Sequence, residues 1–168
     1  VKSAIENSNL KSHVIDELIM GQVLTASVGQ NPARQAAIKA GLPVEKTAYV
    51  INQVCGSGLR SIVSGYQSIL LNDSKIIIAG GQESMTNAPH TLKFRKGEKM
   101  DESNLIDTMI KDGLWDAFNG YHMGVTAENV ANKWKITRED QDRCALSSQL
   151  KAEKAPKENK LKSEIVSL

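Results

Sequence analysis

Short apolar stretches and one amphipathic stretch alternate along the first half of the chain. Residues 14–24 and 48–54 are rich in Val, Ile and Leu, and residues 75–79 contain three consecutive isoleucines. Apolar runs of this length predict strands, and the third predicts a strand buried on both faces, as in a covered parallel sheet. Two helices are predicted in this part of the chain. The first covers about 32–40, starting at Pro32 and stopping before Gly41, and the second covers 59–71. This order of elements predicts an α/β layered fold.

The stretch 59–71 has two faces of different character. Its apolar positions recur at helical spacing: Leu59, Ile62, Val63, Tyr66, Ile69 and Leu70. Small residues occupy the opposite face: Ser57, Ser61, Ser64, Gly65 and Ser68. We expect another layer of the fold to pack very close to this small-residue face.

The character of the chain changes after Glu83. Residues 84–120 are polar and rich in Met, with Pro89, Gly97 and Gly113 as breakers and one short helix predicted near 106–111. Helices are predicted at 123–134 and after Thr137, where Asp140 completes a capping-box variant; Pro156 ends or bends the last helix. We therefore predict a core part at 1–83 and a second part at 84–168. A helix already under way at 1–5 and a strand-like end at 164–168 suggest that both ends are cut.

Composition and charge narrow the range of functions. A net charge of +2 over 168 residues does not indicate a nucleic-acid partner. Residues 151–162 carry both Lys and Glu side chains, a pattern that is typical of a solvent-exposed surface. No apolar run reaches the roughly 18 to 20 residues of a membrane span, and no secretory signal is visible. The two cysteines, Cys55 and Cys144, do not form a disulfide framework. A reduced, cytoplasmic location is expected.

The strongest local signal for chemistry is Cys55, within the sequence NQVCGSG. It follows a predicted strand and precedes a predicted helix, where the orphan N–H groups and the helix dipole stabilise a thiolate. Its own N–H could help to hold an oxyanion. On position alone, a small buried hydrophobe is an equally good interpretation of this cysteine. Cys144 lies within a predicted helix and has no comparable setting.

Two further segments are candidate binding elements. His122 and Met123 precede the predicted helix at 123–134 and could reach a ligand, although a structural role for His122 is the commoner outcome. Residues 80–85 end a predicted buried strand, where ligands of α/β sheets tend to bind. The chain has no Walker motif, dinucleotide fingerprint or metal-ligand spacing.

Five ordered segments resemble the thiolase family, and within it the acetyl-CoA acetyltransferases. They are GQNPARQAAIKAGLP, NQVCGSGLRSI, AGGQESMTNAPH, IDTMIKDGL and GYHMGVTAENVA, and together they span nearly the whole chain. The resemblance implies the N-terminal half of a layered α-β-α-β-α fold, without its first strand, followed by part of a loop domain with an oligomerisation segment.

The resemblance also implies an activity, partners and site residues. Cys55 would be acetylated by acetyl-CoA, and a second acetyl-CoA would take the acetyl group to give acetoacetyl-CoA, or the reverse. His122 and Met123 would line the CoA and acyl pocket, and Leu114 would lie beside the pantetheine. No metal or cofactor beyond the CoA thioester is implied. The implied assembly is a homotetramer, built as a dimer of dimers.

Part of the family pattern is absent from these 168 residues. The NEAF-like, GHP and CxGGG motifs, which supply an Asn, the activating His and a second Cys, do not occur. We therefore expect the chain alone to have little or no activity. Three alternatives are a ketoacyl synthase, a truncated non-catalytic module for dimerisation or CoA binding, and an unrelated α/β interaction domain.

Overall fold

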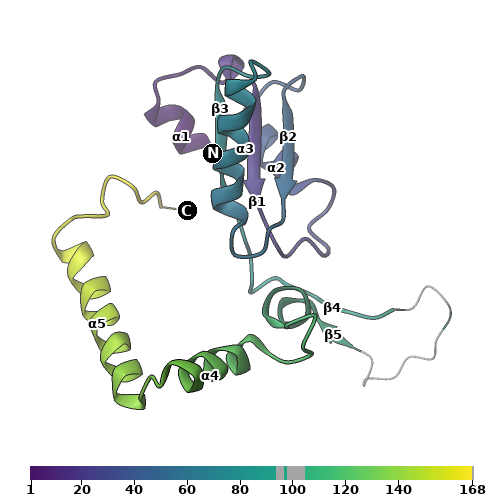
Figure 1. The fold of residues 1–168 in the computed structure, drawn as a ribbon. Coiled ribbons are helices and arrows are strands. Elements are labelled where there is room, and N and C mark those ends of the chain that lie inside the picture. Colours follow the sequence, from purple (N-terminus) through teal and green to yellow (C-terminus); the bar gives the residue numbers. More distant parts are fainter. Residues whose placement is uncertain (94–96, 98–104, 168) are drawn as a thin grey trace. The chain divides into compact units, whose positions relative to one another are not determined.

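The computed structural model describes residues 1–93, 97 and 105–167. The chain divides into two compact units, Val1–Trp115 and Asp116–Leu168, which are described separately (Figure 1). The predicted division near Glu83 falls within the first unit. The predicted boundary separates the core of the family fold from its loop domain, whereas the two compact units are defined by contacts between residues. The predicted division therefore stays a prediction.

The first unit is built on a sheet of three parallel strands, β1 (Glu17–Gly21), β2 (Thr47–Ile51) and β3 (Ile77–Gly81). Their order is β2-β1-β3, and Gly21 pairs with both Ile51 and Gly81. The three carboxyl ends therefore meet at one edge of the sheet. The predicted α/β order is confirmed, although β1 and β2 are shorter than predicted and β3 lies two residues later.

Helix α3 (Ser57–Leu70) covers one face of this sheet through its small side chains. Its buried residues are Ser57, Ser61 and Gly65. A Cβ atom at Gly65 would lie 3.2 Å from Cγ2 of Ile77, so any larger residue here would require the Ile77 side chain to shift by a few tenths of an ångström. The Ser61 hydroxyl donates to the carbonyl of Gly80 at 2.8 Å. The predicted close packing on the small-residue face is confirmed.

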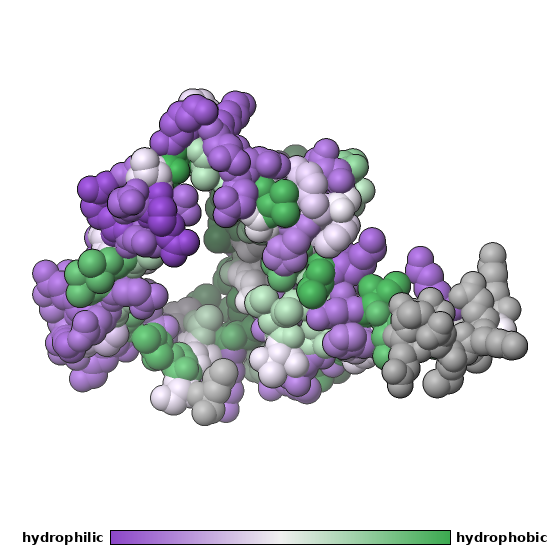
Figure 2. Space-filling view, turned by 90° about the horizontal axis from the view of Figure 1, so that it is seen from below, coloured by the Kyte–Doolittle hydropathy of each residue, from purple (hydrophilic) through white to green (hydrophobic). Residues whose placement is uncertain are grey.

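The opposite, apolar face of α3 is exposed in this chain. Between 43% and 69% of each large side chain there is accessible to solvent: Leu59, Ile62, Tyr66, Ile69 and Leu70. Other apolar side chains also reach the surface among polar ones (Figure 2). Strand β3 is only half-buried, contrary to the prediction, because one of its edges has no neighbouring strand among the described residues.

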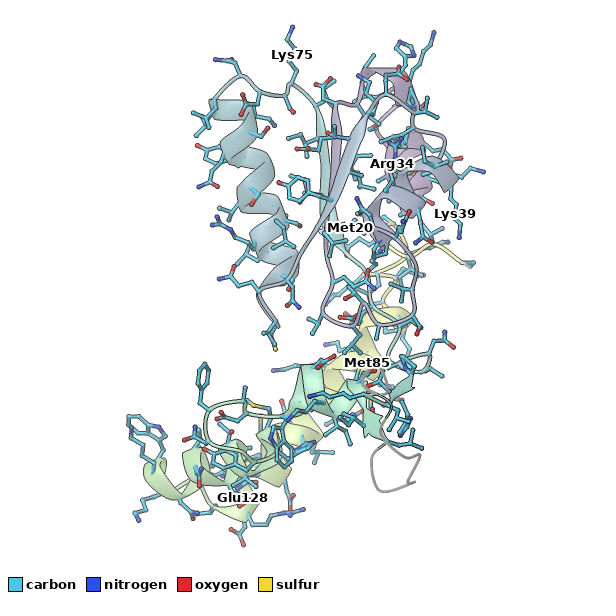
Figure 3. All side chains as sticks on the ribbon, turned by 90° about the vertical axis from the view of Figure 1, so that its right-hand side faces the viewer. Met20, Arg34, Lys39, Lys75, Met85 and Glu128 are labelled. Atoms are coloured by element: carbon cyan, nitrogen blue, oxygen red, sulfur yellow. The ribbon has the colours of Figure 1, made fainter. Side chains whose placement is uncertain are left out.

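The hydrophobic core lies on the other face of the sheet, beneath α1 (Lys2–Asn7) and α2 (Pro32–Lys39). Its buried members are Ile5, Ile15, Leu18, Met20, Ala33, Ala37 and Leu42. Helix α2 begins where predicted, with Pro32 in its first turn and the Asn31 side chain accepting from the Arg34 N–H at 3.1 Å. Figure 3 shows α2, with Arg34 and Lys39, on the side of the sheet opposite α3.

The rest of the first unit is a short hairpin-like pair and a π-helix, together with the one-turn helix η1 (Ser12–Val14) near the N-terminus. Strands β4 (His90–Thr91) and β5 (Ile106–Asp107) pair antiparallel, and η3 (Met109–Leu114) follows. The Asp107 carboxylate accepts from the Met109 N–H at 2.9 Å and so starts the helix three residues later than predicted. The predicted break at Gly97 lies in a segment that is mostly outside the described residues.

The second unit contains two helices, α4 (Met123–Trp134) and α5 (Arg138–Lys157). Both begin where the sequence predicts, and the capping box of Thr137 and Asp140 is present. Helix α5 continues one residue beyond Pro156. Among the described residues, no helix combines the length and apolarity that a membrane span requires.

Candidate active site

Cys55 lies in a tight turn between β2 and α3. Val54, immediately before it, has a positive φ of 48°. A β-branched residue rarely adopts this conformation, because its side chain crowds the backbone. The Asn52 side chain accepts from the Val54 N–H at 3.0 Å, and the Gly56 N–H donates to the carbonyl of Gln53 at 3.0 Å. Strand β2 ends at Ile51, earlier than predicted, because the chain turns here.

The hydroxyl of Ser57 ties both sides of this turn together. It accepts from the Gln53 N–H at 2.9 Å and donates to the carbonyl of Val54 at 2.6 Å. Ser57 is 4% exposed, so water competes little for these bonds. The backbone around Cys55 is therefore held from within its own turn.

The end of β1 fixes the position of the turn against the sheet. A Cβ atom at Gly21 would lie 2.5 Å from the carbonyl carbon of Ser57 and 2.6 Å from the nitrogen of Gly58. Real Cβ atoms do not approach this closely, so only glycine permits the contact. The start of α3, and Cys55 with it, thus lies directly beside the carboxyl edge of the sheet.

A polar network builds the facing wall from the ends of β1 and β3. The Glu83 carboxylate accepts from the N–H groups of Val23 and Leu24 at 2.9 and 3.0 Å. The Gln82 side chain donates to the Gln22 side chain at 2.8 Å, and Gln22 donates to the carbonyl of Leu24 at 2.9 Å. Gln22 is buried. These hydrogen bonds hold the loop after β1 in place, and the Cys55 thiol takes no part in them.

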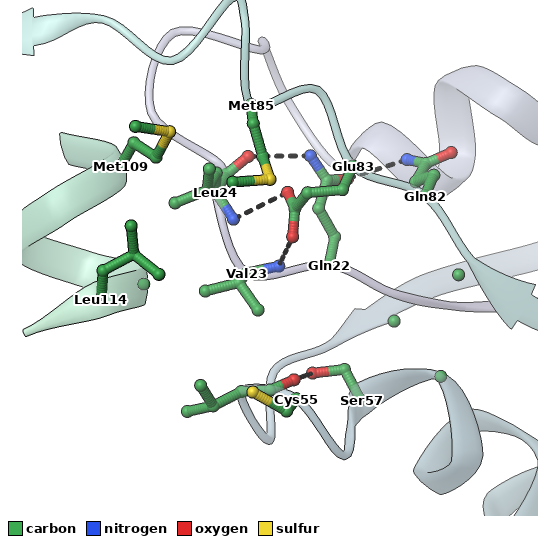
Figure 4. Close-up of a pocket in the computed structure, with 15 residues that line it drawn as sticks. Gln22, Val23, Leu24, Cys55, Ser57, Gln82, Glu83, Met85, Met109 and Leu114 are labelled. Atoms are coloured by element: carbon green, nitrogen blue, oxygen red, sulfur yellow. Dashed lines mark hydrogen bonds between the residues drawn. The ribbon is translucent and has the colours of Figure 1, made fainter. Parts of the chain in front are cut away.

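Between these walls lies a pocket of about 490 Å³ (Figure 4). Its lining is mostly apolar, with Val23, Leu24, Val54, Met85, Met109 and Leu114 around the Cys55 thiol. The predicted site residues Cys55 and Leu114 therefore share one cavity, although 59 positions separate them (114 − 55). Pockets of this size and lining suit the apolar part of a small ligand.

The thiol is placed for nucleophilic chemistry. Cys55 is exposed, not a buried hydrophobe, so a substrate can reach its sulfur. No side chain of the described residues caps α3. The Ser57 N–H donates to the Val54 carbonyl, and the N–H groups that follow it in the first turn point toward the start of the helix, where they stabilise negative charge. The described residues that line the pocket include no histidine, and they therefore offer no imidazole to take the thiol proton.

His122 and Met123 lie in the second unit. The Nδ1 atom of His122 accepts from the Gly124 N–H at 2.9 Å, so the imidazole caps α4. Met123 opens that helix and is 44% exposed. His122 thus has a structural role, the capping of α4, as is common for a single histidine. The contact of His122 and Met123 with CoA stays a prediction.

Several residues of the site were not singled out for chemistry from the sequence. Gln22 and Met109 line the pocket, and the Ser57 hydroxyl organises the turn. Met85 also lines the pocket, but it belongs to residues 80–85, a predicted binding element. For Ser57 the sequence predicts only close packing, on the small-residue face of the helix. The one available signal was a polar Gln directly after an apolar strand, at the edge where ligands bind. Among the described residues, no group of three or more His, Cys, Asp or Glu side chains could hold a metal ion.

This combination of a parallel sheet, a helix start and a cysteine beside an apolar pocket agrees with comparisons to known proteins. The whole chain, residues 1–168, matches the family described as "Thiolase, N-terminal domain". The chain therefore belongs to the thiolase family. The Acat5 thiolase from Ascaris suum, solved in complex with coenzyme A, superposes with a TM-score of 0.93 at 37% identity, over 99% of this chain and 44% of that one. The predicted thiolase-like fold is thereby confirmed.

Two relatives named acetyl-CoA acetyltransferase are more similar in sequence. The protein of Rhizobium meliloti (strain 1021) is 58% identical and that of Paracoccus denitrificans 57% identical, each over 166 residues. Each match covers 99% of this chain and 42% of the relative. The chain thus spans about two fifths of the length of the curated relatives that it matches.

Proposed function

We propose that this chain forms the N-terminal part of an acetyl-CoA C-acetyltransferase, with Cys55 as the acylated nucleophile. The reaction condenses two acetyl-CoA molecules to acetoacetyl-CoA and CoA, or runs in reverse as thiolysis. The observation that supports it most directly is the exposed Cys55 thiol, at the start of α3, in an apolar pocket beside the sheet edge. The names of the relatives supply the acetyl-CoA.

The proposed chemistry balances in two half-reactions. The Cys55 thiolate attacks the thioester carbonyl of acetyl-CoA; a sulfur–carbon bond to Cys55 forms, the bond to the CoA sulfur breaks, and CoA leaves as the thiol after protonation. A second acetyl-CoA then loses a proton from its methyl carbon to a base that the rest of a family-length subunit would supply, and this base later returns the proton to the Cys55 thiolate. That carbon attacks the acetyl-cysteine, and acetoacetyl-CoA leaves as the Cys55 thiolate re-forms. Thiols and thioesters suffice, so we propose no metal or further cofactor.

The substrate contacts follow from the shape of the pocket. We assign Leu114 to the pantetheine, because it contributes an apolar wall to the cavity that holds Cys55. His122 and Met123 are assigned to the CoA and acyl pocket on the match of GYHMG to the family. Met85 and Met109 add flexible apolar surface around the thiol.

The activity requires partners for Cys55 that the described pocket does not supply. The exposed apolar face of α3, with Leu59, Ile62 and Tyr66, offers a surface on which the rest of a family-length subunit would pack. We therefore propose that the chain by itself has little or no turnover. A homotetramer, built as a dimer of dimers, and a cytoplasmic location are proposed from the family resemblance.

Thiolysis of acetoacetyl-CoA tests this proposal. A family-length subunit that carries this chain is expected to consume acetoacetyl-CoA and CoA and to lose turnover with Cys55→Ala. A non-catalytic CoA-binding module would bind CoA equally well in both proteins and turn over in neither. The two proposals are thus separated by comparing turnover and CoA binding in the same pair of proteins.

A further inference from the structure

We propose that Ser57 is a positioning residue for Cys55, because its hydroxyl holds Val54 in the left-handed conformation that presents the thiol. This inference deepens the proposed function and rests on it for the role of Cys55. Ser57 itself does not contact the acyl group in this scheme. It acts through the backbone of the residue that precedes the nucleophile.

The geometry assigns this role to the Ser57 side chain. One oxygen accepts from the Gln53 N–H at 2.9 Å and donates to the Val54 carbonyl at 2.6 Å. The Ser57 N–H also donates to the Val54 carbonyl, at 3.1 Å. The carbonyl of Val54 is thus fixed by two donors from one residue, and its N–H is held by Asn52.

The turn needs this support because its central residue is valine. A β-branched residue at a φ of 48° is disfavoured by contacts between its side chain and the backbone. Strained conformations persist where the surrounding structure over-determines them. Without the Ser57 hydroxyl, Val54 is expected to relax toward negative φ and to displace Cys55 from the pocket.

Ser61 provides a matched control on the same helix face. It is fully buried, and its hydroxyl donates to the carbonyls of Gly58 and Gly80 at 2.7 and 2.8 Å. It joins α3 to β3, and both of its acceptors, Gly58 and Gly80, lie outside residues 52–55. Ser57→Ala and Ser61→Ala each remove one buried hydroxyl, but only the first loosens the Cys55 turn.

The test measures single-turnover acetylation of Cys55 by acetyl-CoA in a family-length subunit that carries this chain. Ser57→Ala is expected to lower the maximal rate about 10- to 100-fold, since displacement of a reacting group by about 1 Å has an effect of that size. The acetyl-CoA concentration at half-maximal rate should hardly change. Ser61→Ala should acetylate at nearly the wild-type rate, with a similar fall in melting temperature. Equal rate losses in the two variants overturn the proposal.

A second comparison measures the effect of Ser57→Ala in a background where residue 54 is not strained. Glycine adopts positive φ without strain, so Val54→Gly should make the Ser57 hydroxyl largely dispensable. The double variant Val54→Gly with Ser57→Ala is then expected to acetylate as fast as Val54→Gly alone. A further loss as large as that caused by Ser57→Ala in the wild-type background contradicts the proposed role.

Alkylation of Cys55 by iodoacetamide separates failure of this inference from failure of the proposed function. It needs no acyl-CoA and depends on the position of the thiol at the start of α3. Ser57→Ala is expected to slow alkylation about two- to fivefold relative to Ser61→Ala. If that holds while wild-type Cys55 is never acetylated, the acyltransferase function fails and the positioning role stands. Identical alkylation rates in the two variants overturn the positioning role.

Discussion

The last residue of β1, Gly21, lies against the backbone of Ser57, the first residue of α3. A Cβ atom at Gly21 would approach the carbonyl carbon of Ser57 to 2.5 Å. The contact joins the carboxyl edge of the sheet to the turn that holds Cys55. The nucleophile is therefore positioned by the packing of two backbones, with no side chain between them.

Gly21→Ala tests this contact. The added methyl group must push the start of α3 away from β1, and overpacking of this kind typically lowers the free energy of unfolding by about 1–3 kcal/mol. Urea denaturation measures the loss. Gly58→Ala is the control, because nothing lies within 4 Å of its added Cβ atom. Equal stability of the two variants would show that the close approach is not present in solution.

Glu83→Gln tests the polar wall of the pocket. The carboxylate accepts from the N–H groups of Val23 and Leu24, and an amide replaces one of its acceptor oxygens by a donor. We expect a loss of about 1 kcal/mol in unfolding free energy, because solvent reaches part of this bond pair. The exposed Glu45, changed to Gln in the same way, should lose nothing measurable. The proposed role of Glu83 fails if both variants denature at the same urea concentration.

Leu114→Ala tests the assignment of the pantetheine contact. Truncation removes apolar surface that substrate and transition state would touch equally, so KM for acetyl-CoA should rise about tenfold while kcat changes little. Steady-state thiolase assays of a family-length subunit measure both constants. Leu10→Ala, a partly exposed leucine outside the pocket, is the control. An unchanged KM in Leu114→Ala would remove this residue from the binding site.

Asp16 predicts a dependence of stability on pH. Backbone hydrogen bonds from Lys75 and then Ile76, with the Lys46 ammonium, hold the pKa of Asp16 below its ordinary value. A lowered pKa in the folded state stabilises the fold above the unfolded value, and the stabilisation is lost as the pH falls through the folded pKa, below about pH 4.

The measurement for Asp16 compares the wild-type chain with Asp16→Asn. Melting temperatures from neutral pH down to about pH 3 should show the wild type losing its advantage below about pH 4. Asp73→Asn, a change of the same type in the same unit, is measured beside it as the control for the loss of one carboxylate. Parallel curves for the wild type and Asp16→Asn would contradict the stabilising role of this carboxylate.

Local patterns were sufficient to predict the α/β order of the fold. Apolar runs, the Pro32 start of α2 and the capping box at Thr137 each act over a few residues, so they are readable from sequence. The Cys55 and Leu114 assignments came from the family resemblance, and the structure places both in one cavity.

The features that the sequence did not reveal depend on contacts between distant residues. The hydroxyl of Ser57 has a role only because the chain turns at Val54, and Gln22 meets Gln82 only after the sheet has formed. The π-helix Met109–Leu114 begins late, after a turn in which the Asp107 carboxylate accepts from the Met109 N–H. A strand buried on both faces was predicted for residues 75–79, but burial also depends on which strands lie beside it.

Whether acetyl-CoA acetylates Cys55 decides whether this thiol is the nucleophile. A family-length subunit carrying this chain is incubated with acetyl-CoA and digested, and its peptides are analysed by mass spectrometry beside a Cys55→Ala variant. We expect one acetyl group on Cys55, absent from the variant and removed when CoA is added in excess. No acetyl group on Cys55, or one that persists in the variant on a residue such as Cys144, would contradict it.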